Sequence, residues 1–146
     1  MGWAQYAGGS VKPVDQTKFG WPEGNCLLAA TASILELELD ALEDMSSACQ
    51  RFGIDYGSGD PRWWFAYLDV LRKVGWTAFD VPNGRDEWPA IVPSGYAIAS
   101  GKSPRDLWHS TVALDGVIVH DPHPSRAGIA SVLSWTVLHR LADARC

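Results

Sequence analysis

The chain has 146 residues, of which 47% are hydrophobic, and a formal net charge of −5. This length and apolar content fit one globular domain with a complete core of its own. Phosphate binding needs clustered Lys and Arg, and the 12 basic residues here are scattered, which argues against a nucleic-acid partner. No stretch approaches the roughly 20 apolar residues of a membrane-spanning helix, so a membrane partner is not expected either.

The cysteines are odd in number: Cys26, Cys49 and Cys146. Residues 1–10 contain neither the basic nor the apolar segment of a secretion signal. The cysteine spacings are also not those of a zinc site. We therefore expect reduced thiols, a cytoplasmic location and no cofactor.

Residues 1–12 are predicted to form a flexible leader, because Gly and Ser punctuate them, and 13–146 a single domain. After a turn that contains proline and glycine, apolar residues at helical spacing predict a first helix over 26–38. Asn25 is a suitable N-cap for this helix.

A second helix is predicted over 39–51 with Asp40 as its cap, and a third over 61–74, because proline suits a first helical turn. Beyond residue 75 the pattern changes to short runs rich in β-forming residues. These predicted strands are 76–81, 95–100, 108–114, 117–121 and 132–138. Helices followed by strands indicate an α+β fold with the helices on one side of an antiparallel sheet.

Cys26 stands where the turn enters the first predicted helix. Free N–H groups and the helix dipole favour negative charge there, which is expected to lower the thiol pKa and raise the fraction of nucleophilic thiolate. Gly24 is expected to leave room for a substrate backbone. The alternative is a buried structural cysteine on an apolar helix. Cys49 and Cys146 lack this setting and are expected to be inert.

A nucleophilic cysteine needs a base and a group that orients the base. His109 lies in one predicted strand, and Asp121 ends the next. If Asp115-Gly116 is a two-residue turn, Asp121 lies opposite Ser110 and points away from His109. If the loop has three residues with Gly116 in a left-handed bulge, Asp121 lies opposite His109, with Cβ atoms about 4.5–5.5 Å apart. A His–Asp pair therefore requires the bulged loop; the sequence allows both.

The stretch 24–30, Gly-Asn-Cys-Leu-Leu-Ala-Ala, resembles the nucleophile segment of papain-like cysteine peptidases. The later stretches 109–112, His-Ser-Thr-Val, and 117–122, Val-Ile-Val-His-Asp-Pro, are similar to the His and Asp-Pro strands of the peptidase C39-like branch. The order Cys, His, Asp also matches, and the likeness covers roughly 14–122. It implies a papain-like fold, with an N-terminal Cys-bearing helix packed on a C-terminal antiparallel β-sheet.

The resemblance implies that Cys26 is the nucleophile, His109 the base and Asp121 the group that orients it. It also implies an upstream glutamine whose side-chain amide stabilises an oxyanion. Gln16 is the candidate, although it stands ten residues before Cys26, farther than the family's usual spacing. The Cys26 backbone N–H and the Asn25 amide are the substitutes if Gln16 does not reach.

Trp21 and Trp108 either wall the substrate cleft or pack in the core. Arg126 either clamps a substrate carboxylate through a bidentate contact or pins a loop. His120, Asp121 and His123 resemble a metal cluster, but two prolines stiffen this run and a distant further ligand is not evident. No metal site is therefore expected.

Together these features predict a thiol hydrolase, a cysteine peptidase, isopeptidase or amidase, that forms an acyl-thioester on Cys26. Its partner would be a peptide, a protein or another amide-containing substrate. The alternatives are an acyl transferase or a cell-wall amidase of the same fold, a catalytically inactive papain-like binding module, and a metallohydrolase.

Overall fold

The structure is a computed structural model, and it describes residues 11–84 and 91–142. Most of the predicted leader therefore lies outside the described residues. At its end, the backbone N–H of Lys12 already donates to the carbonyl of Ser33, at 3.2 Å. Within the described ranges the helices precede the strands, as the sequence predicts, and no helix is long and apolar enough to cross a membrane.

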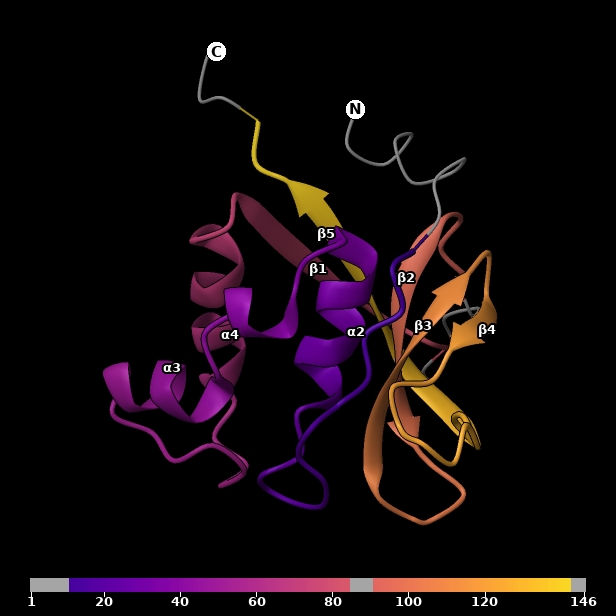
Figure 1. The fold of residues 1–146 in the computed structure, drawn as a ribbon, viewed down its shortest axis with the longest axis horizontal. Helices are drawn as coiled ribbons and strands as arrows, with labels where there is room; N and C mark the ends of the chain where they lie inside the picture. Colours follow the sequence, from indigo (N-terminus) through magenta and orange to yellow (C-terminus); the bar gives the residue numbers. More distant parts are fainter. Residues whose placement is uncertain (1–10, 85–90, 143–146) are drawn as a thin grey trace.

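Helix α2, Cys26–Leu35, begins at the predicted residue and is the central element of the helical layer (Figure 1). Every residue of 28–34 is buried, which explains why apolar residues cover more than one side of this helix. The helix ends earlier than predicted because Glu36 adopts a left-handed conformation with φ 56°. The hydroxyl of Thr31 meets the Tyr67 hydroxyl at 2.8 Å and joins α2 to helix α4, Trp63–Arg72.

The prediction of one helix over 39–51 is wrong. A single 3-10 turn, Leu39–Ala41, is followed by an extended residue, Leu42, and then by helix α3, Met45–Arg51. The cap is Asp44 rather than Asp40, because its carboxylate accepts a hydrogen bond from the backbone N–H of Ser47 at 2.9 Å. A well-placed capping carboxylate thus divides the predicted helix in two.

The strands form one antiparallel sheet in the order β1-β5-β2-β3-β4. They are β1 (Trp76–Pro82), β2 (Tyr96–Lys102), β3 (Trp108–Leu114), β4 (Val117–His120) and β5 (Ser131–Arg140). Each lies within two residues of a predicted strand, and β3 has the predicted bounds.

The main core lies between the helices and one face of this sheet, with α2 against β2 and β3 and α4 against β1 (Figure 1). Ile98 and Val112 are the fully buried sheet residues beneath α2. A smaller cluster on the opposite face comprises Ala97, Ala99, Ala113 and Trp135. The α+β prediction is confirmed at this level.

Candidate active site

Cys26 is the first residue of α2 and lines a cavity of about 420 Å³. Burial raises the pKa of its thiol, while hydrogen bonds from Ser110 and from the backbone at the start of the helix lower it by less. The predicted lowering of this pKa is therefore wrong in direction for the free protein. The helix N-terminus acts as expected, but the loss of solvent around the thiol is the larger effect.

The cavity is lined by aromatic side chains from loops, the start of α4 and the start of β3, and by hydroxyl groups from the sheet. The aromatic residues are Trp21, Tyr56, Trp63, Trp64 and Trp108, and the hydroxyl residues are Ser100, Ser110, Ser134 and Thr136. Trp21 and Trp108 are 58% and 51% exposed, so they wall the cavity instead of filling the core. A chamber of this composition can hold an apolar group while hydrogen-bonding its polar atoms.

His109 and Asp121 are in direct contact, with His109 Nε2 2.6 Å from Asp121 Oδ1. Both side chains are almost completely buried, and His109 also lines the cavity. Because Nε2 is engaged by the carboxylate, Nδ1 is the ring nitrogen left to exchange a proton. The pair is thus arranged as a base with an orienting carboxylate.

Asp121 is held as a carboxylate by a complete set of hydrogen bonds. Besides His109, it accepts from the backbone N–H of His123 at 2.8 Å and from that of Gly128 at 2.7 Å. Burial alone would raise the pKa of Asp121, but these hydrogen bonds and the His109 contact outweigh it and the pKa is lowered.

The His–Asp contact arises by a route that the sequence did not indicate. Leu114 pairs with Val117, so Asp115-Gly116 is a two-residue turn with φ 51° and 83°, one of the two alternatives that the sequence allows. The expectation that a His–Asp pair requires the three-residue loop is wrong. A register shift then occurs inside the strand pair, between Val112 and Ala113.

This shift pairs Val112 with His120, so that one extra residue lies in β4. An extra residue moves every later side chain to the other face of the sheet. Asp121 therefore projects on the same face as His109 even though the turn is the tight one.

Gln16 reaches the same cavity as Cys26 and His109. Its side chain is 7% exposed, and Nε2 donates to the carbonyl of Lys18 at 2.9 Å. Its Oε1 is buried and has no hydrogen-bond partner among the described residues. A primary amide carries two N–H groups, so the second one remains for a group in the cavity.

Asn25 occupies the predicted N-cap position, but its side chain makes no cap hydrogen bond. Its Oδ1 accepts from the backbone N–H groups of Thr17 and Lys18, both at 3.0 Å, and its Nδ2 donates to the Thr17 hydroxyl at 2.9 Å. Asn25 therefore fixes the segment after Gln16, and its expected role as a substitute oxyanion donor is not supported by these contacts.

Gly24 is needed by the turn itself. Its N–H donates to the Gly20 carbonyl at 2.6 Å, and a Cβ at position 24 would lie 2.7 Å from that oxygen. Gly24 also lines the cavity, and its expected role in leaving room for a substrate backbone stays a prediction.

Arg126 pins the N-terminal segment, which corrects its expected role in substrate binding. Its guanidinium makes a bidentate contact with Asp15, at 2.6 and 2.8 Å, and also donates to the Asp121 carbonyl. It lies at a different hollow from the one that Cys26 lines. Because the Arg126 guanidinium binds both carboxylate oxygens of Asp15, it stabilises the fold at this point.

His120, Asp121 and His123, which resemble a metal cluster in the sequence, contact different groups in the fold. His120 Nε2 lies 2.9 Å from the Val14 carbonyl, and His123 Nδ1 lies 2.9 Å from the Ser125 hydroxyl. Among the described residues, no group of three or more His, Cys, Asp and Glu side chains could hold a metal ion.

The other two cysteines are Cys49 and Cys146. Cys49 is fully buried in α3, and burial raises the pKa of its thiol. Cys146 lies outside the described residues.

The residues that line the cavity but were not assigned to a site from the sequence include Arg105, Ser110 and His123. The ring of His123 packs edge-on against that of His109, with centroids 6.1 Å apart, and burial lowers the pKa of His123. For Ser110 a signal existed, because it directly follows the predicted base, His109, in a predicted strand.

No family model, curated protein or solved structure matches the chain.

Proposed function

We propose that the chain is a thiol hydrolase of the papain-like type, with Cys26 as nucleophile, His109 as base and Asp121 as the group that orients the base. The observation that carries this proposal is the buried 2.6 Å contact between His109 and Asp121 at a cavity that Cys26 also lines. The helix-before-sheet order and the sequence resemblance support the same conclusion.

The reaction starts from a protonated thiol, because burial raises the pKa of Cys26. His109 Nδ1 accepts the thiol proton while sulfur forms a bond to the amide carbon. The carbon–nitrogen bond then breaks, and the amine leaves with the proton that His109 returns. Water, deprotonated by His109, cleaves the thioester and releases a carboxylic acid and the free thiol.

The negative oxygen that forms in each step needs hydrogen-bond donors. The backbone N–H of Cys26 lies in the first turn of α2, where N–H groups have no partner within the helix. The second N–H of the Gln16 amide is the other donor. Asp121 keeps the His109 ring in position and stabilises it when it is protonated.

The main competing function is a binding module that kept the fold without turnover. The raised pKa of the Cys26 thiol is the observation that favours it, because a protonated thiol is a weak nucleophile. The buried His109–Asp121 pair argues for the enzyme, since a binding site has no need of an oriented imidazole.

Acetylation by 4-nitrophenyl acetate tests the proposal without knowledge of the natural substrate. We expect an acetyl group on Cys26, located by mass spectrometry, and release of 4-nitrophenolate. Cys26→Ala should fold with an unchanged circular dichroism spectrum and release none above background. Release that persists in folded Cys26→Ala, with no adduct on Cys26 in the wild type, would remove the basis for a thiol mechanism.

A further inference from the structure

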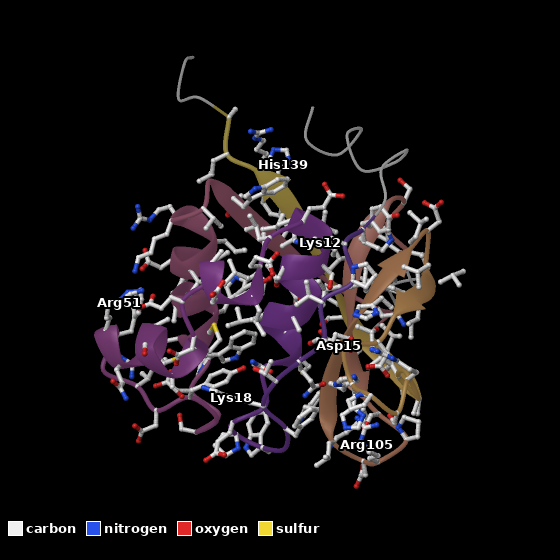
Figure 2. All side chains as sticks on the ribbon, in the orientation of Figure 1. Lys12, Asp15, Lys18, Arg51, Arg105 and His139 are labelled. Carbon is white, nitrogen blue, oxygen red and sulfur yellow. The ribbon has the colours of Figure 1, made fainter. Side chains whose placement is uncertain are left out.

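Arg105 lies in the loop between β2 and β3, shortly before His109, and lines the cavity. In Figure 2 it lies at the same end of the molecule as Lys18, where α2 begins in Figure 1. Its Nη1 donates to the Ser125 hydroxyl at 2.7 Å, and that hydroxyl lies 2.9 Å from His123 Nδ1. His123 in turn packs against His109, so Arg105 is connected to the base through two side chains.

Arg105 differs from most other arginines in the described part of the chain. Arg51, Arg62, Arg72 and Arg126 each form an ion pair with a carboxylate. Arg105 forms none within the described residues, and one Ser125 contact leaves most of its five N–H groups free. It is also the only arginine among the described residues that line the cavity.

The carboxylates that line the cavity do not neutralise Arg105. Asp60 is engaged by Arg62 at 2.6 Å. Asp80 lies on β1, at the opposite edge of the sheet from the β3–β4 pair. The end of the cavity beside His109 therefore carries a positive charge that is available to an anionic group.

The proposed mechanism places the amine half of the substrate at the end of the cavity beside His109. His109 must return its proton to the departing amine, so the amine half lies over His109. The acyl half lies toward Gln16 and the start of α2, where the carbonyl oxygen is held. Arg105, connected to His109 through Ser125 and His123, thus lies on the amine side.

We propose that Arg105 is a specificity residue that binds a carboxylate carried by the amine half of the substrate. The substrate class is then an amide whose amine portion bears a carboxylate close to the scissile bond. This inference rests on the proposed thiol hydrolase function. It assigns to Arg105 the carboxylate-binding chemistry that the sequence suggested for Arg126.

The test uses the reverse half-reaction, in which an amine takes the acetyl group from Cys26 and leaves a free thiol and an N-acetyl amide. Protein acetylated with neutral 4-nitrophenyl acetate is mixed with glycinamide, glycine or aspartic acid α-amide. These amines carry no carboxylate, an α-carboxylate and a side-chain carboxylate, respectively. The rate constant for each is expressed relative to glycinamide in the same protein.

We expect at least one carboxylate-bearing amine to lose about tenfold of its relative rate in Arg105→Gln, because a charge-assisted contact disappears. Arg105→Lys should keep part of the advantage, and salt should weaken it. Arg140→Gln, at the exposed end of β5, is the matched control and should change nothing. If the relative rate of glycine falls in Arg105→Gln, the amine half of the substrate is a C-terminal residue with its α-carboxylate. If the relative rate of aspartic acid α-amide falls, the carboxylate belongs to an acidic side chain.

The proposal is overturned if neither relative rate changes in Arg105→Gln, or if neither amine exceeds glycinamide in the wild type. Failure of the hydrolase function gives a different result, since acetyl-Cys26 would then not form at all. The circular dichroism spectrum and the urea unfolding curve of Arg105→Gln, compared with those of the wild type, show whether the variant is folded, and the ratio to glycinamide removes any general change in the rate.

Discussion

The side chain of Asn25 connects the nucleophile segment to the candidate oxyanion donor. Three hydrogen bonds join Asn25 to Thr17 and Lys18, and the Lys18 carbonyl holds the Gln16 amide. The backbone N–H of Asn25 also donates to the Lys18 carbonyl at 3.2 Å. Removal of Asn25 should therefore release Gln16 from its place in the cavity.

A double-mutant cycle on Gln16 and Asn25 tests this connection. Gln16→Ala should slow acetylation of Cys26 about 100-fold, as loss of an oxyanion donor does in other acyl-transfer enzymes. Asn25→Ala should slow it in the same range, and the double variant should be no slower than the slower single variant. Stopped-flow release of 4-nitrophenolate gives the rates.

Alkylation of Cys26 by iodoacetamide is the control for this cycle, because that reaction forms no oxyanion. Its rate should stay within about twofold in all three variants. Asn83→Ala, which removes an asparagine that contacts β5, is a comparison outside the cavity. Additive losses, or alkylation that falls in parallel with acetylation, would contradict the role given to Asn25.

At the scale of single residues, the sequence could indicate which side chains are candidates for chemistry but not what surrounds them in the fold. Cys26 at a helix start was recognisable from the turn before it. The direction of its pKa shift was not, because it depends on the burial of the thiol in the folded chain, which outweighs hydrogen bonds from Ser110 and from the start of the helix. The roles of Arg105 and Arg126 were likewise undecidable, since ion-pair partners such as Asp15 are distant in sequence.

Strand bounds could be predicted well because alternation and turn residues are local signals. Register could not, because the bulge between Val112 and Ala113 has no clear signature in the residues around it. The predicted helix over 39–51 failed for a related reason. Asp40 and Asp44 are both of a residue type that favours N-caps, and in the fold only Asp44 caps a helix, whereas Asp40 lies inside the 3-10 turn.

A second irregularity lies beside His109, at Gly101. This glycine pairs with His109 across β2 and β3, and the register between β2 and β5 shifts at Ser100/Gly101. A Cβ at position 101 would lie 2.0 Å from the carbonyl oxygen of Ser131, which belongs to the backbone and cannot simply rotate away. The sheet therefore depends on glycine at this point.

Gly101→Ala should lower the free energy of unfolding by about 2–3 kcal/mol, because the sheet must distort to admit the methyl group. Gly53→Ala is the matched control, since position 53 has φ 70° and open space around it, and strain alone should cost about 1 kcal/mol. Urea denaturation followed by tryptophan fluorescence measures both. Equal losses in the two variants would show that the contact with Ser131 imposes no constraint.

For the whole molecule, the order of elements was the most predictable property. Helices that precede β-rich runs indicate segregated layers, and the structure has its helices against one face of a single sheet. The cavity was not predictable, because its lining comes from the starts of α2 and α4, from several loops and from four strands. Only the folded chain brings Gln16, Cys26 and His109 to one chamber.

The charge distribution predicts how the stability of the whole molecule changes with pH. Hydrogen bonds and ion pairs lower the pKa of several carboxyl groups, and that of Asp60 falls to about 2. The others are Asp15, Glu38, Asp44, Asp69 and Asp121. A carboxyl group with a lowered pKa stabilises the fold above its unfolded pKa of about 4, and this contribution is lost as the pH falls through the folded value.

The free energy of unfolding should therefore decrease below about pH 4, after a smaller decrease that starts near pH 6.5 because the folded chain lowers the pKa of His123. Urea denaturation at a series of pH values measures it. Asp121→Asn should reduce the steepness of the decrease, whereas Asp106→Asn, at a side chain that is 94% exposed, should not. Stability that rises on acidification would contradict the charge distribution described.

The most direct test of the Cys26–His109–Asp121 mechanism compares the acetylation rate of Cys26 with that of N-acetylcysteine at neutral pH. Burial raises the pKa of the Cys26 thiol, so without a base a smaller fraction of it is nucleophilic thiolate at neutral pH than of a free thiol. Cys49 is fully buried and should not interfere. We predict that Cys26 reacts about 100-fold faster than N-acetylcysteine and that His109→Ala falls below it. A wild-type rate no greater than that of the free thiol, or one that His109→Ala retains, would contradict the mechanism.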